Sequence, residues 1–196
     1  MAVPDLRTRI IDALSNSGSA SSDFDLNKSI MPAKLAQTPA AVLLAIHPVL
    51  ETVILTKRSA RLKHHPGQIA FPGGKQDPTD ATLTDAALRE AHEEIGLPYG
   101  IVDVLGALPT HQTVTGYQMT PIVGVLTADY DPVPEEGEVS EVFEIPLSHL
   151  ANPANYRIEG RYWRGQRREY YAVPYGPYYV WGATARILRG FADRLS

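Results

Sequence analysis

Residues 71–97 read FPGGKQDPTDATLTDAALREAHEEIGL, and this stretch decides the fold expected around it. The glycine pair at its start allows a tight turn, and Thr79 or Asp80 provides an N-cap for a helix. Apolar residues recur at helical spacing as far as Ile95, after which Gly96 gives an ordinary stop signal. The stretch therefore predicts a loop, a helix to about Ile95 and a second loop.

The predicted helix carries three carboxylates on one face. Glu90, Glu93 and Glu94 stand at i, i+3 and i+4, so their side chains leave the helix within one turn. Carboxylate oxygens suit hard cations such as Mg²⁺ or Mn²⁺, which keep room for water and phosphate oxygens. The alternative is that the cluster is a solvent-exposed charged face, in which an ion pair such as Arg89 with Glu93 reduces the repulsion between the carboxylates. The preceding glycine pair favours a metal site, because its backbone can approach a metal or a phosphate.

Strands are expected on both sides of this segment, and helices at both ends of the chain. Helical spacing predicts helices at about 6–14 and 183–195. We interpret residues 1–35 as a helix with a flexible connector and residues 36–196 as the main domain. Strands mixed with helices without regular alternation predict an α+β fold. Apolar, β-branched or tyrosine-rich runs predict strands at 40–46, 52–56, 102–108, 120–127 and 142–145, and within 156–181 with turns at Gly160, Gly165 and Gly176.

The composition limits the possible functions. The 196 residues are 44% hydrophobic and carry a formal net charge of −4, so no general basic field attracts nucleic acid or an anionic membrane. The absence of cysteine excludes disulfides, thiolate metal sites and thiol nucleophiles. No apolar run is long enough for a signal peptide or a membrane span. We therefore expect a cytoplasmic protein without nucleic-acid or membrane partners.

The deciding stretch resembles the Nudix box, in which a glycine and a glutamate precede REUxEExGU, with U apolar. REAHEEIGL at 89–97 matches the second half. Counted from Gly74, the acidic position falls on Asp80, and eight residues rather than seven separate it from Arg89, so Ala81 stands where the strict pattern has glutamate. Asp80 is either this acidic position or a helix cap. The same expanded spacing is similar to that of the coenzyme A diphosphatase branch of the superfamily.

A second segment also resembles that branch. Residues 54–59 read ILTKRS, and FPGG follows at 71–74 after Lys63 and Gly67. The branch has arginine where Lys63 stands, and lysine keeps the charge but loses the planar fork. The resemblance covers most of the chain from about residue 40. It continues through 108–126, 138–150 and 180–188.

The resemblance implies a Nudix fold, a mixed β-sheet sandwiched between helices with the catalytic loop-helix-loop at about 71–98. It implies that Glu90 and Glu94 ligate the divalent ion, that Glu93 shares a second ion or holds a water, and that the Gly73 carbonyl completes the shell. Arg89 is expected to orient the glutamates. The catalytic candidates are Glu93, Glu90, Arg89 and Glu141. The substrate-binding candidates are Arg58, Lys63, Gly67 and Gly74.

Two features leave alternatives open. Glu138 and Glu141 are expected in a loop near the metal, where either one is a further ligand, the general base or a solvated side chain. The second feature is a set of arginines interleaved with aromatic residues, which either hold an anion and stack a base or cover a solvated hairpin. These arginines are Arg157, Arg161, Arg164, Arg167 and Arg168.

The function implied is Mg²⁺- or Mn²⁺-dependent hydrolysis of the pyrophosphate bond of coenzyme A and its thioesters. The products are 3′,5′-ADP and 4′-phosphopantetheine or its acyl derivative. One alternative is a pyrophosphatase acting on ADP-ribose or another nucleoside diphosphate derivative. Another is a Nudix-fold binding module without catalysis, which the retained Glu90, Glu93 and Glu94 disfavour. The partner is a small molecule, and both a monomer and a homodimer remain open.

Overall fold

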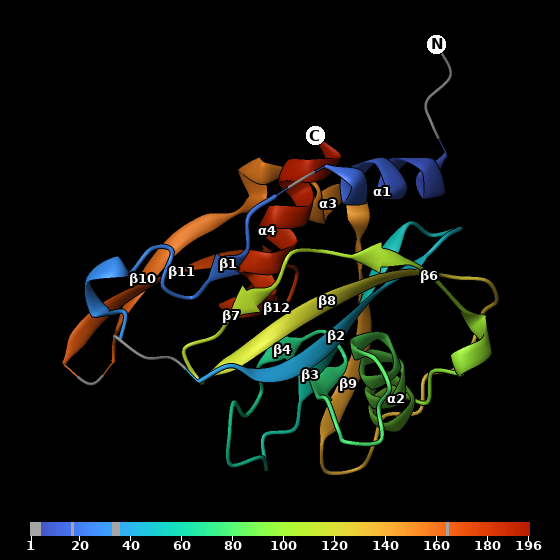
Figure 1. The fold of residues 1–196 in the computed structure, drawn as a ribbon, viewed down its shortest axis with the longest axis horizontal. Helices are drawn as coiled ribbons and strands as arrows, with labels where there is room; N and C mark the ends of the chain where they lie inside the picture. Colours follow the sequence, from blue (N-terminus) through green and yellow to red (C-terminus); the bar gives the residue numbers. More distant parts are fainter. Residues whose placement is uncertain (1–4, 17, 33–35, 164) are drawn as a thin grey trace.

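The computed structural model describes residues 5–16, 18–32, 36–163 and 165–196, which form a mixed β-sheet covered by helices (Figure 1). The helices are α1 (Leu6–Ser15), α2 (Leu83–Ile95), α3 (Leu147–Leu150) and α4 (Ala183–Leu195), with short 3-10 helices η1 (Lys28–Ile30), η2 (Tyr99–Ile101) and η3 (Pro153–Asn155). The strands are β1 (Ser21–Ser22), β2 (Thr38–His47), β3 (Thr52–Arg58), β4 (Ile69–Ala70), β5 (Gly73–Lys75), β6 (Val102–Ala107), β7 (His111–Gln112), β8 (Tyr117–Leu126), β9 (Val139–Pro146), β10 (Arg157–Trp163), β11 (Gln166–Tyr175) and β12 (Tyr178–Trp181).

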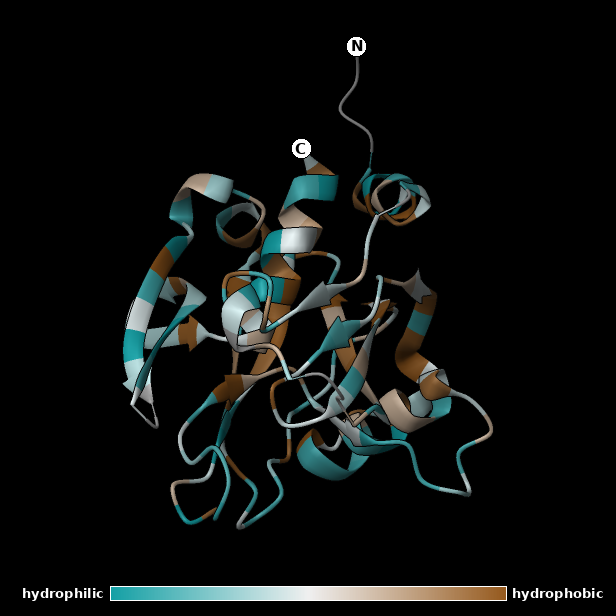
Figure 2. Ribbon diagram, turned by 60° about the vertical axis from the view of Figure 1, so that its left-hand side comes forward, coloured by the Kyte–Doolittle hydropathy of each residue, from teal (hydrophilic) through white to brown (hydrophobic). Residues whose placement is uncertain are grey.

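Strand β2 is the centre of the larger sheet. It pairs in parallel with β8 from Thr38 to Ile46, and its other edge pairs antiparallel with β3 and β5. Both faces of β2 are buried, which explains its nearly continuous apolar sequence. One face packs toward α1 and α4 through Val42, Leu44 and Ile46. The other packs toward α2 through Ala41, Leu43 and Ala45. Figure 2 shows hydrophobic colour on the inner elements and hydrophilic colour on the outer loops.

Helix α2 lies close to the sheet because both contacting surfaces are small. Its buried residues include Ala86, Ala87 and Ala91, which face the alanines of β2. The helix begins later than expected, because Thr82 is its N-cap and forms a capping box with Asp85. The expected cap at Thr79 or Asp80 is therefore wrong. The stop at Gly96 is confirmed, with φ at 69°.

The N-terminal segment packs on the same core as the rest of the chain. Ile10 and Ala13 of α1 are fully buried in the cluster that contains α4. Ser21 and Ser22, within the expected connector, pair in parallel with β7. Arg186 of α4 holds Asp25 at 2.8 Å. The described part of residues 5–32 thus forms one wall of the domain.

The second sheet has the order β10-β11-β12, and the β10–β11 hairpin projects at the left of Figure 1. The turns expected at Gly165 and Gly176 are confirmed. The turn expected at Gly160 is wrong, because Gly160 lies inside β10 opposite Glu169 of β11. Arg164 lies outside the described residues. Among the described helices, none is both long and apolar enough to cross a membrane.

Candidate active site

The glycine pair of β5 lies directly on the acidic face of α2. The Gly73 N–H donates to Glu94 Oε2 at 3.1 Å. A Cβ atom on Gly74 would lie 2.5 Å from the Glu90 carboxylate, and one on Gly73 would lie 2.4 Å from the Ala41 carbonyl oxygen. Gly73 also has a φ of 154°, which L residues rarely adopt. Glycine is therefore required at position 73, whereas a side chain at position 74 would have to displace the Glu90 carboxylate.

Arg89 holds the acidic residues in place, as the sequence predicts for this side chain. Its Nη1 donates to Glu90 at 3.0 Å and to Glu93 at 3.1 Å. Its Nε and Nη2 both donate to Asp80 at 3.0 Å, and Nη2 also reaches the Lys75 carbonyl oxygen at 3.1 Å. The hydrogen bond from Arg89 lowers the pKa of Asp80. One guanidinium thus ties the loop before α2 to the helix.

Glu94 and Glu90 are carboxylates with too little positive charge around them. The Glu94 side chain is only 7% exposed, and its nearest described cation is Arg58, 3.9 Å away. Burial raises the pKa of Glu94 to about 7, although the Gly73 N–H and Arg58 oppose this shift. Burial likewise raises the pKa of Glu90, and Arg89 opposes it. The negative charge of these two partly buried carboxylates is thus incompletely balanced.

The donor set fits a hard divalent cation. Within the described residues, no three histidine, cysteine, aspartate or glutamate side chains converge into a complete metal cage. The Glu93 side chain does not converge with those of Glu90 and Glu94, because it pairs with Arg89 and is 58% exposed. Mg²⁺ is commonly held by one or two carboxylates, with water and substrate phosphates filling the other positions. Glu90 and Glu94 suit that mode of binding.

Of the two downstream glutamates, Glu138 is the one near the acidic cluster. Its carbonyl oxygen accepts from the Ser59 N–H at 2.7 Å, and its charge contributes to the raised pKa of Glu94. Glu141 does not lie in a loop as expected. It belongs to β9, opposite Lys57, and accepts a hydrogen bond from the Tyr178 hydroxyl at 2.6 Å. The loop expectation fails because the pairing of β9 with β3 begins at Val139.

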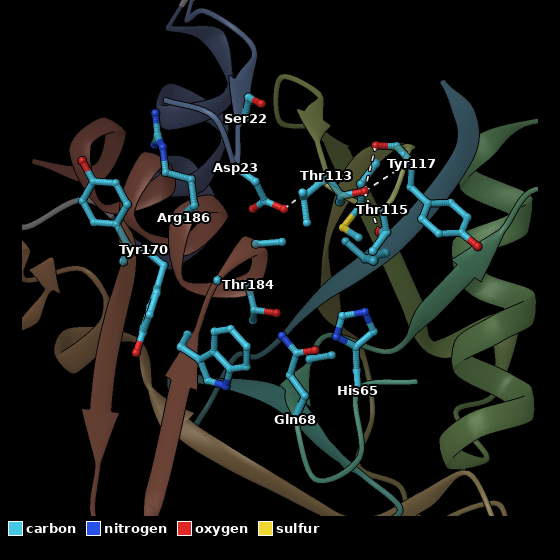
Figure 3. A pocket seen from close by; sticks show the side chains of 18 of the residues that line it. Ser22, Asp23, His65, Gln68, Thr113, Thr115, Tyr117, Tyr170, Thr184 and Arg186 are labelled. Atoms are coloured by element: carbon cyan, nitrogen blue, oxygen red, sulfur yellow. Dashed lines mark hydrogen bonds between the residues drawn. The ribbon is translucent and has the colours of Figure 1, made fainter. Parts of the chain in front are cut away.

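A cavity of about 890 Å³ lies beside the glycine pair (Figure 3). Its walls come from the N-terminal segment, the loop after β3, the β7–β8 turn, the second sheet and the start of α4. In Figure 3, His65 and Gln68 approach from one side, opposite Asp23 and Thr113. Gly73, Gly74 and Arg58 belong to both the cavity and the acidic cluster. They join a substrate-sized space to the two carboxylates.

The other candidate substrate residues lie farther from the carboxylates. Lys63 is exposed and does not line the cavity. Gly67 forms a turn with φ at 69° and lines a smaller space of about 250 Å³. That space also contains Arg161 and Trp181, whose guanidinium and ring are 4.2 Å apart. Asp80, for which the sequence left two roles open, binds Arg89. Asp23, to which the sequence assigned no role, lines the cavity.

The site first defines a class of protein, one with partly buried carboxylates beside a cavity large enough for a small-molecule ligand. Comparison with known proteins identifies the class further, since the family model described as NUDIX domain matches residues 37–164. The Nudix hydrolase NudL from Enterobacter sp. (strain 638) is 45% identical over 140 residues, covering 71% of this chain and 73% of that protein. NudL from Cronobacter sakazakii is 43% identical over 168 residues, covering 85% and 88%.

Solved structures share the fold. The MutT protein from Methanosarcina mazei Go1 matches with a TM-score of 0.53 at 19% identity, over 84% of this chain and 96% of that chain. The NUDIX domain of Shewanella oneidensis NrtR, complexed with ADP ribose, matches with a TM-score of 0.50 at 18% identity, over 87% and 93%. The chain belongs to the Nudix hydrolase family. Nudix hydrolases generally use divalent ions such as Mg²⁺ or Mn²⁺.

The close approach of Gly74 to Glu90 can be tested by Gly74→Ala. The added methyl group would displace the Glu90 carboxylate, so we expect pyrophosphate hydrolysis to fall by at least about tenfold. The matched control is Gly100→Ala, because no atom lies within 4 Å of a Cβ built there. Initial rates and thermal unfolding of both variants are compared with the wild type. Wild-type rates in Gly74→Ala would contradict the contact.

The burial of Glu94 predicts a gain in stability for Glu94→Gln in metal-free buffer. Because burial raises the pKa of Glu94 from 4.5 to about 7, stability is lost as the pH rises through this interval, and the loss is complete above about pH 7. We expect the unfolding temperature of the variant to rise by about 4 °C near pH 8 and by much less near pH 5, where the folded wild type is protonated. With metal and substrate present, kcat should fall by about a hundredfold. Equal shifts at both pH values would exclude this origin.

Proposed function

We propose that this Nudix hydrolase cleaves the pyrophosphate bond of coenzyme A and its thioesters in the presence of Mg²⁺ or Mn²⁺. The products are 3′,5′-ADP and 4′-phosphopantetheine or its acyl derivative, and the proposed location is the cytoplasm. The observation that carries the proposal is the cavity, because it joins the glycine pair and is lined by more cations than anions. ADP-ribose or another nucleoside diphosphate derivative is the alternative substrate class.

The charges around the cavity support a ligand with several phosphates. The lining carboxylates are those of Asp23 and Glu169. Arg58 lies beside Glu94, close to where a reacting pyrophosphate would bind, whereas other cations come from the second sheet and α4. A 3′-phosphate remote from the scissile bond could use these distant cations. The lining arginines and lysine are Arg58, Lys75, Arg161, Arg168 and Arg186.

An aromatic surface in the cavity suits the base of such a ligand. The Arg161 guanidinium lies over the Trp181 ring at 4.2 Å and near the Tyr170 ring at 5.9 Å. The two rings also contact each other, with centroids 5.3 Å apart. Flat aromatic and guanidinium groups stack well on a purine. We therefore propose that the nucleotide end of the substrate lies toward the second sheet.

The proposed roles of the acidic residues follow from their contacts. Glu90 and Glu94 would hold the divalent ion, with the Gly73 carbonyl as a further proposed ligand. When bound, such an ion neutralises charge that develops on phosphoryl oxygens and lowers the pKa of bound water. Arg89 keeps Glu90 and Glu93 oriented through its two hydrogen bonds. For the proton acceptor we propose Glu138 ahead of Glu141, because its charge acts on Glu94.

A pair of variants separates the two basic candidates of the loop after β3. Arg58→Ala removes a cation that lines the cavity, so we expect the KM for coenzyme A to rise about tenfold. Lys63→Ala removes an exposed cation outside the lining, and we expect a rise of about twofold at most. Steady-state kinetics at one ionic strength gives both values. A larger effect at Lys63 would show that the loop binds substrate in another arrangement.

The substrate assignment is tested by comparing coenzyme A, dephospho-coenzyme A and ADP-ribose. We expect kcat/KM for coenzyme A to exceed that for ADP-ribose by at least about tenfold, equivalent to about 1.4 kcal/mol of transition-state binding. Initial rates are measured with Mg²⁺ and with Mn²⁺ at one salt concentration. A loss confined to dephospho-coenzyme A would locate recognition at the 3′-phosphate. Equal or better efficiency with ADP-ribose under both metals would reject coenzyme A and leave the hydrolase assignment intact.

A further inference from the structure

Strand β10 is a seven-residue edge strand that lacks lysine, proline and a bulge, although three of its residues are charged. It packs extensively against β11 alone among the described elements, and its outer edge forms no backbone hydrogen bond within the described part of the chain. Edge strands are usually blocked by charged side chains, above all lysine, by proline or by a bulge, because a free edge invites pairing with another chain. The sequence RIEGRYW of β10 contains neither lysine nor proline, and its pairing with β11 is regular over all seven residues.

The hydrogen bonds of β11 show which groups of β10 point outward. Both the N–H and the carbonyl of Glu169 bond the Asn27 side chain, at 2.9 and 2.7 Å, so Glu169 directs its backbone away from β10. Gly160 lies directly opposite Glu169 in the antiparallel ladder. Two opposite residues point their backbone N–H and carbonyl groups either both toward the other strand or both away from it, so those of Gly160 point away from β11. Ile158 and Tyr162, two residues to either side, do the same. All three present free donors and acceptors at the edge.

The residues on the two sides of Gly160 would complement each other if two copies of β10 paired antiparallel. In an antiparallel pair of two β10 strands centred on Gly160, Glu159 of each copy stands opposite Arg161 of the other. Ile158 stands opposite Tyr162 in the same way. Both side chains are solvent-exposed in the single chain, Ile158 at 55% and Tyr162 at 79%. One register therefore pairs the opposite charges and also the apolar side chains. In the same register, the outward-pointing backbone groups of Ile158, Gly160 and Tyr162 face those of the second copy.

We propose that two copies of this chain associate through β10, antiparallel and two-fold symmetric about Gly160. About six backbone hydrogen bonds would join the copies, two between the glycines and four from the Ile158 and Tyr162 pairs. The pairing would extend the second sheet into one sheet across both copies. Because Arg161 lines the cavity, the second copy would contribute Glu159 to its edge.

The backbone pairing is tested by Gly160→Pro. Proline removes an N–H that faces outward, so the ladder with β11 keeps its donors, while the ring displaces the Arg167 side chain, which lies 2.8 Å from a Cβ built at Gly160. Sedimentation at about 10 to 200 µM should give the wild type a mass near twice 21.5 kDa at the upper end. Gly160→Pro should remain at the single-chain mass at every concentration and still unfold in one cooperative transition, which shows that the single chain is folded. A monomeric wild type over this range, or a dimer that survives Gly160→Pro, would overturn the proposal.

The register is tested by charge reversal. Glu159→Arg and Arg161→Glu each place like charges opposite each other, so each variant alone should be monomeric. A mixture of the two variants restores both opposite-charge pairs and should form a heterodimer, detected with one variant carrying a mass tag. The double variant should dimerise like the wild type. Loss of a contact within one chain would not be rescued by mixing, so absence of the heterodimer from two folded variants would contradict the register.

Discussion

The structure depends on the contact between the main chain of Gly73 and Gly74 and the carboxylates of Glu90 and Glu94. Two acidic side chains are partly withdrawn from water there, against one backbone N–H and few cations. Withdrawal of charge from water is unfavourable, so the surrounding fold has to supply the compensation. β5 is held by its pairing with β2, and α2 by the small alanines on both contacting surfaces. Arg89 adds the fixed cation that keeps the acidic residues oriented.

The cavity shows how distant parts of the chain meet at this contact. The N-terminal segment reaches it because α1 packs on α4 and Ser21–Ser22 pair with β7. Asn27 then joins this segment to β11, which carries part of the opposite wall. Asp23 is fixed by the buried His111 at 3.1 Å and by the Val114 N–H at 2.9 Å. The residues proposed to recognise the substrate are therefore distributed over the chain, whereas the proposed metal ligands come from one helix and one turn.

The sequence predicted the elements whose signal is local. The α+β fold, the helix that ends at Gly96 and the Arg89–Glu93 pair could be read from spacing and cap residues. The start of α2 was misplaced because three polar residues could each cap it, and only the Thr82–Asp85 capping box decides between them. Asp80 was taken for a possible cap for the same reason. Its partner Arg89 lies nine residues away and becomes adjacent only once the loop folds back.

Features set by tertiary pairing were not accessible in this way. Glu141 was expected in a loop, yet the ladder between β3 and β9 includes it. Gly160 resembles a turn residue, and only its pairing with Glu169 shows that β10 continues through it. The serine-rich connector gave no sign of β1, because two residues of strand carry no pattern. Asp23 entered the site through this segment, without any motif of its own.

The central claim is that Glu90 and Glu94 share a divalent cation beneath the glycine pair. The most direct measurement is anomalous diffraction from crystals soaked in Mn²⁺, collected near the manganese absorption edge, because it locates the ion independently of any rate. The account predicts a peak within coordination distance of oxygens from both Glu90 and Glu94, beside the Gly73 main chain. A manganese peak bound elsewhere, with both carboxylates left without metal, would contradict it.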